Sequence, residues 1–409
     1  MRALYLCYFG LREPLVQTQV LPYLRELVRN GVAMALITFE PEPDETWMAE
    51  WRERLRAEGI EWEMLRYHKR PTLPATFFDI LAGAWRAVRM ARRSGVDLFH
   101  ARSHVGAAIG ALAKKMSGAR LLFDVRGLLP EEYVDSGNWR NDGFLYRLTK
   151  RAERWLFASA DGFVLLTERA RATLFPDGAG GRPFEVIPCC VSAGRLEPRK
   201  DRAAVRAELG ATDRVVFVYV GALGGYYLVH ETAELLAVAR ERDPRVYALI
   251  LTQGPRAPVI AELEAAGFTK TDYRVMRAQP EDVPRYLSAS DVALSIIRPS
   301  YARIASSPTK FAEYLAAGLP VLSTAGIGDL DAQIEEENVG VLLRSLDRKA
   351  YLEALRAIDA LCRDPELAAR CRRFARRGYE LESVGGPRYL RVYRAVLGSR
   401  LPVVREGKP

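Results

Sequence analysis

Short apolar stretches rich in β-branched residues alternate along the chain with longer segments in which apolar residues recur every three or four positions. The short stretches predict buried strands, and the longer segments predict amphipathic helices. Strands are expected at Ala3–Phe9, Val32–Thr38, Trp62–Tyr67, Asp97–His100, Leu121–Val125, Gly162–Leu166, Phe184–Ile187, Val215–Val220, Tyr247–Thr252, Tyr273–Met276, Val292–Ile297, Val321–Thr324 and Val339–Leu343. Helices are expected between them, for example at Val20–Arg29, Phe77–Arg93 and Tyr146–Phe157. Because almost continuously apolar strands need helices over both faces, the predicted fold class is α/β with parallel sheets.

A stretch rich in proline, glycine, serine and charged residues, Pro188–Asp213, divides this pattern into two halves of similar size. We therefore predict two βα domains, residues 1–190 and 191–385, that face each other across a cleft. In parallel sheets of this kind, ligands bind at the carboxyl ends of the strands. Candidate chemistry is accordingly expected in the loops that follow the predicted strands.

The composition narrows the class of protein. The chain has 409 residues, of which 49% are hydrophobic and 27% charged, so it has enough apolar surface for globular cores. Its net charge of +9 favours anionic partners without choosing among nucleotide sugars, nucleic acid and anionic lipid. No apolar run approaches the ~20 residues of a membrane span, and Met1–Phe9 is too short for a secretory signal, so a cytoplasmic protein is expected. Five cysteines without CxxC spacing and four histidines without an HExxH motif predict no metal site.

Two loops carry glycine directly after a predicted strand. Gly10 follows the first strand of the first domain, and Gly221 and Gly224 follow the first strand of the second domain. Glycine lets the backbone approach a ligand, and the helix that follows offers free N–H groups to an anion. A tight turn without a ligand is the alternative for Gly10, and a purely structural role is the alternative for the second loop. No GxxxxGK[ST] phosphate-binding motif occurs in the chain.

The segment from Ser307 to Gly318 predicts a complete helix. Ser307 suits the N-cap, Pro308 the first helical position and Gly318 the C-terminal stop. Lys310 in the first turn opposes the helix dipole, and Lys310 before Glu313 is the weaker order for an ion pair. Both placements make sense if an anion occupies the start of the helix and a polyhydroxyl group contacts the carboxylate. An exposed Lys–Glu pair is the alternative.

Two arginines precede this helix. Arg298 follows the predicted strand Val292–Ile297 directly, and Arg303 lies further along the same loop. Together with Lys310 they can converge on one diphosphate, because guanidinium groups bind phosphate oxygens through paired N–H donors. Two solvated loop arginines are the alternative that the spacing leaves open.

Two consecutive strands of the first domain end in polar residues. His100, Arg102 and His104 lie at the end of one strand, and Asp124 and Arg126 lie at the end of the next. Because the carboxyl ends of adjacent parallel strands meet at one edge of the sheet, these five side chains are expected to form a polar site. A structural role is the alternative for the histidines.

These motifs, in this order, resemble those of a family 4 glycosyltransferase of the GT-B fold. The resemblance rests on Tyr8–Gln19, Asp124–Gly127, Val186–Val191, Gly221–Gly224, and above all on Ser307–Val321 with Gly326–Asp329. It covers nearly the whole chain and implies two Rossmann-like βα domains, the first for an acceptor and the second for a nucleotide-sugar donor. It also implies that a helix at Tyr389–Leu397, within a C-terminal segment 386–409, crosses back to the first domain. The implied reaction is metal-independent transfer with retention of configuration, without any other cofactor.

The resemblance assigns donor-binding roles to the candidate residues of the second domain. Glu313 matches the second carboxylate of the family's E-x7-E pattern, which binds the donor ribose, whereas Ala305 replaces the first carboxylate. The loop of Gly221 and Gly224 contacts the donor, but it lacks the arginine and lysine that the family often has there. Binding of the donor diphosphate therefore falls to Gly10, Arg298, Arg303, Ser307 and Lys310.

The catalytic candidates implied by the resemblance lie in the first domain. They are Arg126, His104 and Asp124. In retaining transfer the acceptor attacks from the face of the leaving group, and a donor phosphate oxygen takes the acceptor's proton. No dedicated protein base is then needed, so these residues are expected to position hydroxyl groups.

A basic helix gives a further clue to the acceptor. Arg86, Arg89 and Arg93 share one face of the predicted helix Phe77–Arg93, and apolar residues such as Trp85 share another. Such a helix can lie on an anionic bilayer, which would suit a lipid-linked acceptor and peripheral attachment to the inner face of the membrane. A solvated outer face is the alternative. Nucleic acid is not expected, because no recognition-helix motif or aromatic-basic interleaving accompanies the charge.

Glycosyl transfer to a glycan, lipid-linked or small-molecule acceptor, in the synthesis of a surface polysaccharide or glycoconjugate, is therefore the expected function. Two alternatives keep the same fold: a sugar-nucleotide epimerase or hydrolase, and a non-catalytic nucleotide-sugar-binding partner. An epimerase or hydrolase needs a pair of carboxylates around the sugar, and Ala305 argues against that. The missing carboxylate and the altered loop at Gly221 keep the non-catalytic alternative open.

Overall fold

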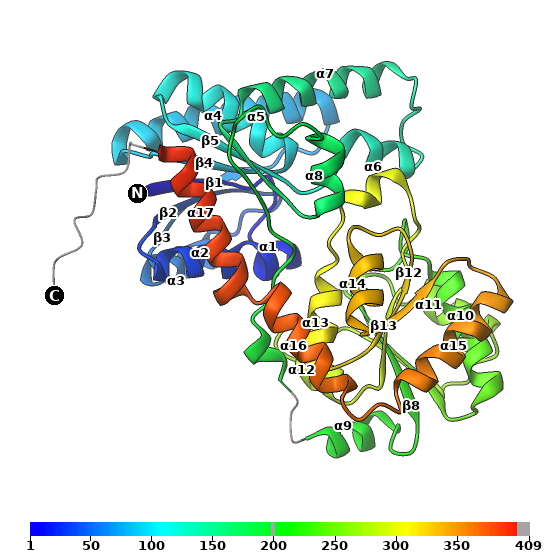
Figure 1. Ribbon diagram of the computed structural model, residues 1–409. Coiled ribbons are helices and arrows are strands. Elements are labelled where there is room, and N and C mark those ends of the chain that lie inside the picture. The colour runs from blue at the N-terminus through cyan, green and yellow to red at the C-terminus, as the bar shows by residue number, and fades with distance from the viewer. Residues whose placement is uncertain (198–200, 399–409) are drawn as a thin grey trace. The chain divides into compact units, whose positions relative to one another are not determined.

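The computed structural model describes residues 1–197 and 201–398, which form two compact units (Figure 1). The first unit contains Met1–Pro188 together with the segment that begins at Val384, and the second contains Cys189–Ser383. Residues 198–200 of the predicted linker and residues 399–409 of the predicted C-terminal segment lie outside the described residues. The described part of the linker is partly helical, because it holds the 3-10 helix Ala193–Leu196 and helix α9 (Arg202–Leu209).

The first unit is built on a sheet of seven parallel strands. They are β1 (Arg2–Leu6), β2 (Ala33–Glu40), β3 (Ile60–Arg66), β4 (Leu98–Arg102), β5 (Arg120–Val125), β6 (Gly162–Leu165) and β7 (Phe184–Val186). Their order in the sheet is β3-β2-β1-β4-β5-β6-β7. The sheet thus grows to both sides of its first strand, as in a doubly wound Rossmann-like fold, and the switch in direction lies between β1 and β4. The loops after β1 and β4 therefore border the edge where ligands bind in such sheets.

Helices cover both faces of this first sheet (Figure 1). They are α1 (Pro14–Gln19), α2 (Leu21–Arg29), α3 (Glu45–Ala57), α4 (Thr72–Ser94), α5 (Ser103–Ser117), α6 (Leu129–Asp135), α7 (Phe144–Ser159), α8 (Glu168–Leu174) and α17 (Gly386–Leu397). Helix α5 packs against both α4 and α7, whereas α17 packs against α2 and against strands β5, β6 and β7. Helix α17, the last helix of the described residues, is therefore part of the first unit.

The second unit repeats the arrangement with six parallel strands. They are β8 (Val215–Val220), β9 (Val246–Leu251), β10 (Tyr273–Met276), β11 (Val292–Ser295), β12 (Val321–Thr324) and β13 (Gly340–Leu343), in the order β10-β9-β8-β11-β12-β13. The switch in direction lies here between β8 and β11, because both strands pair in the middle of the sheet. The loops that follow these two strands are the ones that contain Gly221 and Arg298.

Two apolar clusters form the core of the second unit, one on each face of its sheet. Its remaining helices are α10 (Val229–Arg242), α11 (Ala257–Ala265), α12 (Val283–Ser288), the 3-10 helix Tyr301–Ala305, α13 (Thr309–Ala317), α14 (Leu330–Glu337), α15 (Arg348–Leu361) and α16 (Leu367–Tyr379). Phe311 of α13 packs on one face with Phe374 of α16, and Leu236 of α10 packs on the other face with Tyr351 of α15. A short π-helical turn, Leu381–Gly385, leads from α16 to α17.

The predicted α/β fold with two Rossmann-like domains is confirmed. Every strand of the described chain occurs where the apolar pattern predicts it, and Val215–Val220, Tyr273–Met276 and Val321–Thr324 match to the residue. Strand β11 ends at Ser295, two residues before the predicted end. The reason is that the Ile297 N–H donates to the Thr324 hydroxyl at 3.0 Å instead of continuing the ladder.

Candidate functional site

Helix α13 stands at the centre of the candidate site in the second unit. It begins at Thr309, and Pro308 occupies the N-cap with extended backbone (φ −65°, ψ 119°), so the prediction of Ser307 as N-cap is wrong. The Ser307 hydroxyl oxygen instead accepts the backbone N–H of Cys189 at 3.1 Å. At the other end, Gly318 adopts the left-handed conformation that closes the helix, as predicted.

The first turn of α13 places a buried ammonium among aromatic rings. Lys310 Nζ lies 3.8 Å from the centre of the Tyr219 ring and 4.4 Å from that of Tyr227. It has no hydrogen-bond partner among the described residues. Burial lowers the pKa of Lys310 to about 7, and the charge of Glu313 opposes this shift only in part. The alternative of an exposed Lys–Glu pair is therefore wrong, because the Lys310 ammonium is buried, and a buried charge without a hydrogen-bond partner is costly.

The loop after β8 leaves space for this ammonium. Gly221 has a φ of +125°, and a Cβ atom there would lie 3.3 Å from Lys310 Nζ. Gly224 has a φ of +97° and exchanges two backbone hydrogen bonds with Tyr227, at 3.1 and 3.2 Å. This turn sends the chain back, so that the Tyr227 ring reaches Lys310. Positive φ at both positions favours glycine, because a residue with a side chain is strained in this conformation.

The two predicted arginines have different surroundings. Arg303 is buried, and its guanidinium lies 4.2 Å from the Tyr226 ring, which packs against the ring of Tyr227. Its carbonyl accepts the N–H of Gly328 at 2.9 Å. Arg298 has an exposed side chain and joins the loop through its backbone N–H, which donates to the Tyr226 carbonyl at 2.8 Å. Of the two arginines, Arg303 therefore lies with Lys310 on the rings of Tyr219, Tyr226 and Tyr227, which we call the tyrosine cluster.

Glu313 lies one turn further along α13. Burial raises the pKa of this carboxyl, while the charges of Lys310 and Arg195 lower it. Ala305, at the position of the missing family carboxylate, is itself buried. Glu313 is therefore the carboxylate that α13 offers next to the buried ammonium, and its partly exposed side chain can accept hydrogen bonds from hydroxyl groups.

The hydroxyl of Tyr314 fixes α13 against the sheet. It accepts the Val220 N–H at 2.8 Å and donates to the Leu294 carbonyl at 3.3 Å. These two contacts lie at the carboxyl ends of β8 and β11, where the strand order changes direction. The helix start, the glycine loop and the tyrosine cluster are thereby held at the edge where doubly wound sheets bind ligands. An anion with attached hydroxyl groups fits this set of side chains.

The first unit has its own buried polar network around Asp124. Asp124 Oδ2 accepts the Tyr389 hydroxyl hydrogen at 3.3 Å and lies 3.4 Å from His100 Nε2, and Oδ1 lies 3.5 Å from Arg126 Nη1. Burial acts to raise the pKa of Asp124, but the Arg126 charge and the His100 hydrogen bond outweigh it and lower the pKa to about 2. Burial lowers the pKa of His100, whose Nδ1 lies 2.7 Å from the Tyr393 hydroxyl. Asp124 is thus a fixed anion that ties β5 to α17.

Two guanidinium groups meet beside this network. Nη2 of Arg102 and Nη2 of Arg126 each donate to Gln19 Oε1 at 3.1 Å. Directly after Arg102 the backbone passes through Ser103 with a φ of +61°, a conformation that costs energy for a residue with a side chain. Gln19 is a functional candidate that the sequence analysis missed. Its signal was its place at the end of the family-like segment Tyr8–Gln19.

His104 lies apart from His100, Arg102, Asp124 and Arg126. The prediction that all five side chains form one polar site is therefore wrong for His104. The chain enters α5 directly after Arg102, and the His104 Nε2 atom lies 3.1 Å from Glu153 Oε1 on α7. Its ring packs edge-on against Phe123. This contact matches the structural alternative for the histidine.

Gly10 lies against a buried carboxylate. A Cβ atom at Gly10 would come within 2.7 Å of Glu40 Oε2, and Glu40 Oε1 accepts the Leu11 N–H at 2.7 Å and the Thr38 hydroxyl hydrogen at 2.6 Å. Glycine is needed here for close packing on β2. The role of Gly10 toward a diphosphate stays a prediction.

Two further observations concern metals and membranes. Residues 1–197 and 201–398 contain no group of three or more His, Cys, Asp or Glu side chains placed to hold a metal ion. None of the helices in the same residues combines the length and hydropathy that a membrane-spanning helix needs.

Family models match most of the chain. Residues 16–190 match the glycosyl transferase 4-like domain, and residues 214–359 match the glycosyl transferases group 1 domain. The chain therefore belongs to the group 1 glycosyltransferases of the GT-B fold, and it is a glycosyltransferase. No curated protein sequence matches it significantly.

Solved structures share the fold at low sequence identity. A glycosyltransferase from Rickettsia africae is 14% identical with a TM-score of 0.73, and the match covers 97% of this chain and 98% of that one. Anabaena HepE in complex with UDP-glucose is 15% identical with a TM-score of 0.66, covering 98% and 100%. WaaG, a glycosyltransferase involved in lipopolysaccharide biosynthesis, is 19% identical with a TM-score of 0.67, covering 97% and 100%.

Proposed function

We propose that the protein transfers a glycosyl group from a nucleoside-diphosphate sugar, bound by the second unit, to an acceptor bound by the first. The proposal rests on the buried ammonium of Lys310 beside Gly221, which has no hydrogen-bond partner within residues 1–197 and 201–398. An isolated buried charge is costly, so the site gains free energy when an anion neutralises it. HepE has the same fold and was solved with UDP-glucose, which supports a nucleotide sugar as that anion.

The proposed chemistry breaks the bond between the anomeric carbon and the diphosphate. Negative charge then develops on the leaving diphosphate, where Lys310, Arg303 and the exposed Arg298 stabilise it. Glu313 accepts hydrogen bonds from the donor ribose. The acceptor hydroxyl attacks from the face that the diphosphate leaves, and its proton passes to a phosphate oxygen, so the anomeric configuration is retained. These cations supply the charge that a metal ion would otherwise supply, so the reaction needs neither a metal nor another cofactor.

The acceptor is a glycan, a lipid-linked glycan or a small molecule, and Arg126 is the first-unit residue proposed to meet it. Asp124 and His104 act through the groups that they hold, because both are buried among protein partners. WaaG shares the fold and is involved in lipopolysaccharide biosynthesis, which supports a role in making a surface glycan. We also propose that the protein works in the cytoplasm.

A thermal-shift panel of UDP-, GDP-, ADP- and CMP-sugars tests donor binding first, because stabilisation by a ligand follows RT ln(1 + [L]/Kd). The best donor is then incubated, with a label on its sugar, with and without a cell extract that supplies acceptor. Transfer of label to the extract, insensitive to EDTA and with retained anomeric configuration by NMR, is the expected result.

Other outcomes assign the protein differently. Loss of donor without any acceptor points to an epimerase or hydrolase. Binding without turnover points to a non-catalytic nucleotide-sugar partner. If no nucleotide sugar shifts the melting temperature, the proposed donor site is wrong.

A further inference from the structure

Helix α4 carries a row of large apolar side chains that stay exposed among the described residues of its unit. Leu73, Phe77, Leu81 and Trp85 recur every fourth residue, and they are 57%, 63%, 47% and 57% exposed. We call these four residues the α4 stripe. Single exposed hydrophobic residues are ordinary, but a continuous row along more than three turns of one helix indicates an interaction surface.

Basic residues surround the α4 stripe. Lys69 and Arg70 precede the helix, and Arg89 and Arg92 continue its exposed side in the last turns. The Arg89 guanidinium lies 5.6 Å from the Trp85 ring, so charge and apolar surface touch. An apolar helix face bordered by lysine and arginine is typical of a helix that lies in the headgroup region of an anionic bilayer, which matches both features.

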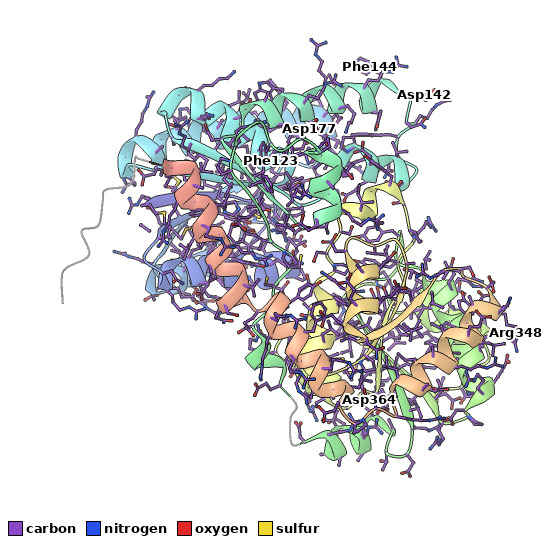
Figure 2. All side chains as sticks on the ribbon, viewed as in Figure 1. Phe123, Asp142, Phe144, Asp177, Arg348 and Asp364 are labelled. Atoms are coloured by element: carbon purple, nitrogen blue, oxygen red, sulfur yellow. The ribbon has the colours of Figure 1, made fainter. Side chains whose placement is uncertain are left out.

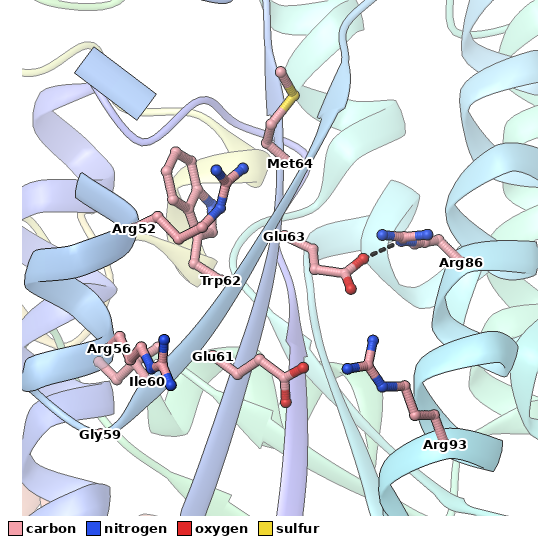
Figure 3. A pocket seen from close by; sticks show the side chains of 10 residues that line it. All are labelled: Arg52, Arg56, Gly59, Ile60, Glu61, Trp62, Glu63, Met64, Arg86 and Arg93. Carbon is pink, nitrogen blue, oxygen red and sulfur yellow. Dashed lines mark hydrogen bonds and ion pairs between the residues drawn. The ribbon is translucent and has the colours of Figure 1, made fainter. Parts of the chain in front are cut away.

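A groove beside α4 adds a concave basic surface (Figure 3). It runs along β3, the edge strand of the first sheet, and encloses about 720 Å³. Arg52 and Arg56 line it from α3, and Arg86 and Arg93 line it from α4. Two carboxylates of β3, Glu61 and Glu63, line the groove opposite these four arginines. Glu63 forms an ion pair with Arg86.

The two carboxylates do not neutralise the positive charge of the four arginines in the groove. Arg52, Arg56 and Arg93 face it together with Glu61, so its surplus charge is positive. We call the arginines Arg52, Arg56 and Arg93 the groove arginines. An anion the size of a phospholipid headgroup matches a basic groove at the side of an apolar helix, because the lipid's acyl chains would then lie along the apolar row.

Buried Asp79 fixes the position of the stripe relative to the sheet. Its carboxylate accepts the Tyr8 hydroxyl hydrogen at 2.7 Å and the His68 N–H at 3.1 Å, and His68 Nδ1 lies 2.6 Å from it. Tyr8 belongs to the loop after β1, and His68 to the loop after β3. The apolar half of α4 is thereby tied to the carboxyl edge of the first sheet, which is where an acceptor is expected.

We infer that α4 and its groove dock the first unit onto an anionic bilayer, with the α4 stripe in the interface and the groove arginines on headgroups. An acceptor held at the adjacent edge of the sheet is then a lipid-linked one. This choice of acceptor rests on the proposed glycosyl transfer, whereas the docking itself does not. The charge balance selects an anionic lipid surface over a second copy of the chain, which would bring the same cations together.

Co-sedimentation of the full-length protein with vesicles tests the docking. One set of vesicles is pure phosphatidylcholine, and the other contains about one third phosphatidylglycerol. Leu81→Ser with Trp85→Ser removes the second half of the α4 stripe, and Tyr301→Ser, at a residue 58% exposed in the second unit, is its control. Arg52→Gln, Arg56→Gln and Arg93→Gln together neutralise the groove. Arg344→Gln, Arg348→Gln and Arg376→Gln, all exposed in the second unit, form the charge-matched control.

The wild type and both controls are expected to bind anionic vesicles more tightly than neutral ones. The groove variant should lose on the order of 100-fold in affinity for anionic vesicles, at roughly a fivefold loss for each arginine, and keep its affinity for neutral ones. The stripe variant should lose about tenfold or more on both. As a check that does not depend on the serine variants, lipids with brominated chains should quench wild-type fluorescence, and Trp85→Phe should remove most of that quenching.

Three results would overturn the inference. They are a wild type that stays in the supernatant with anionic vesicles, variants that sediment as the wild type does, and a wild-type dimer that the stripe variant turns into a monomer. The last result would assign the stripe to a second copy. Vesicle binding is measured without nucleotide, and the stripe variant should keep the wild-type thermal shift with donor. A failure of docking and a failure of the donor site are therefore seen separately.

Discussion

Lys310 Nζ lies 3.8 Å from the centre of the Tyr219 ring, so the first turn of α13 sets a cation on the face of an aromatic residue near the end of β8. The ring offers some electrostatic attraction but no hydrogen-bond acceptor for the ammonium. Burial therefore lowers the pKa of Lys310 to about 7, close to neutral pH. In the proposed function, the donor diphosphate supplies the acceptor that Lys310 lacks among the described residues.

Replacing Lys310 should weaken the binding of nucleoside diphosphates. We expect Lys310→Met to cost about 1–3 kcal/mol of binding free energy, the range for a hydrogen bond to a charged group. Isothermal calorimetry with the best nucleotide measures this change. Lys349→Met, at an exposed lysine of α15, is the matched control and should bind as the wild type does. Equal affinity in the two variants would remove Lys310 from the donor site.

The stability of the ligand-free protein should depend on the protonation of Lys310. Its folded-state pKa of about 7 lies below the ~10.4 of an unfolded lysine, so between these values the unfolded state binds more protons. The free energy of unfolding should therefore rise with pH from neutral toward pH ~10, by up to about 1.4 kcal/mol per pH unit from this group. Urea midpoints of wild type and Lys310→Met across that range measure the contribution. A slope unchanged by the substitution would contradict the buried-ammonium interpretation.

Nucleotide binding should take up a proton. Above neutral pH, Lys310 is mainly uncharged in the free protein, and a diphosphate beside it favours the charged form. Calorimetry at one pH in two buffers of different ionisation enthalpy should therefore give different apparent binding enthalpies, and affinity should fall as the pH rises. Lys310→Met should remove the buffer dependence. If the wild type shows none, the bound anion does not contact this ammonium.

Glu313 is expected to recognise the donor ribose. Glu313→Ala should weaken binding of the ribonucleotide by about 1–3 kcal/mol. It should have little effect on the 2′,3′-dideoxy analogue, which lacks the hydroxyl groups. Glu336→Ala, at an exposed glutamate of α14, serves as control. Equal losses for both nucleotides would show that Glu313 acts on something other than the sugar.

Asp124 should contribute to stability through its buried partners. Removing one member of a buried ionic network costs about 3 kcal/mol or more, so Asp124→Asn should lower the urea midpoint at neutral pH. Because the folded pKa of Asp124 is lowered to about 2, its contribution is complete above pH ~4 and is lost as the pH falls from there toward 2. The gap between wild type and variant should thus shrink at low pH. Asp142→Asn, on an exposed loop of the same unit (Figure 2), should change little.

The fold could be predicted from the sequence because it follows from local pattern. Buried parallel strands are continuously apolar, and the loops between them contain glycine, proline and charged residues. Each strand can therefore be located from its own residues. The ends of the strands could not be predicted as closely as their centres, because they depend on hydrogen bonds to residues far away in the sequence. The hydroxyl of Thr324, which takes the Ile297 N–H, is an example.

The sites could be predicted only in part. The Lys310–Glu313 motif was recognisable because a cation at the start of a helix conflicts with the helix dipole. The tyrosines around Lys310 were not, because Tyr219 looks like an ordinary strand residue until the fold brings α13 onto it. His104 was misplaced for the opposite reason: it is close to Arg102 in sequence, but the turn into α5 directs it to Glu153.

The position of helix α17 in the first unit affects when that unit can finish folding. Its Tyr389 and Tyr393 hydroxyls contact Asp124 and His100, so residues near the end of the chain complete the interior of a sheet whose first strand begins at Arg2. Truncation at residue 188 would leave strands β5, β6 and β7 without this cover. The first unit can therefore complete its core only after α17 has been synthesised.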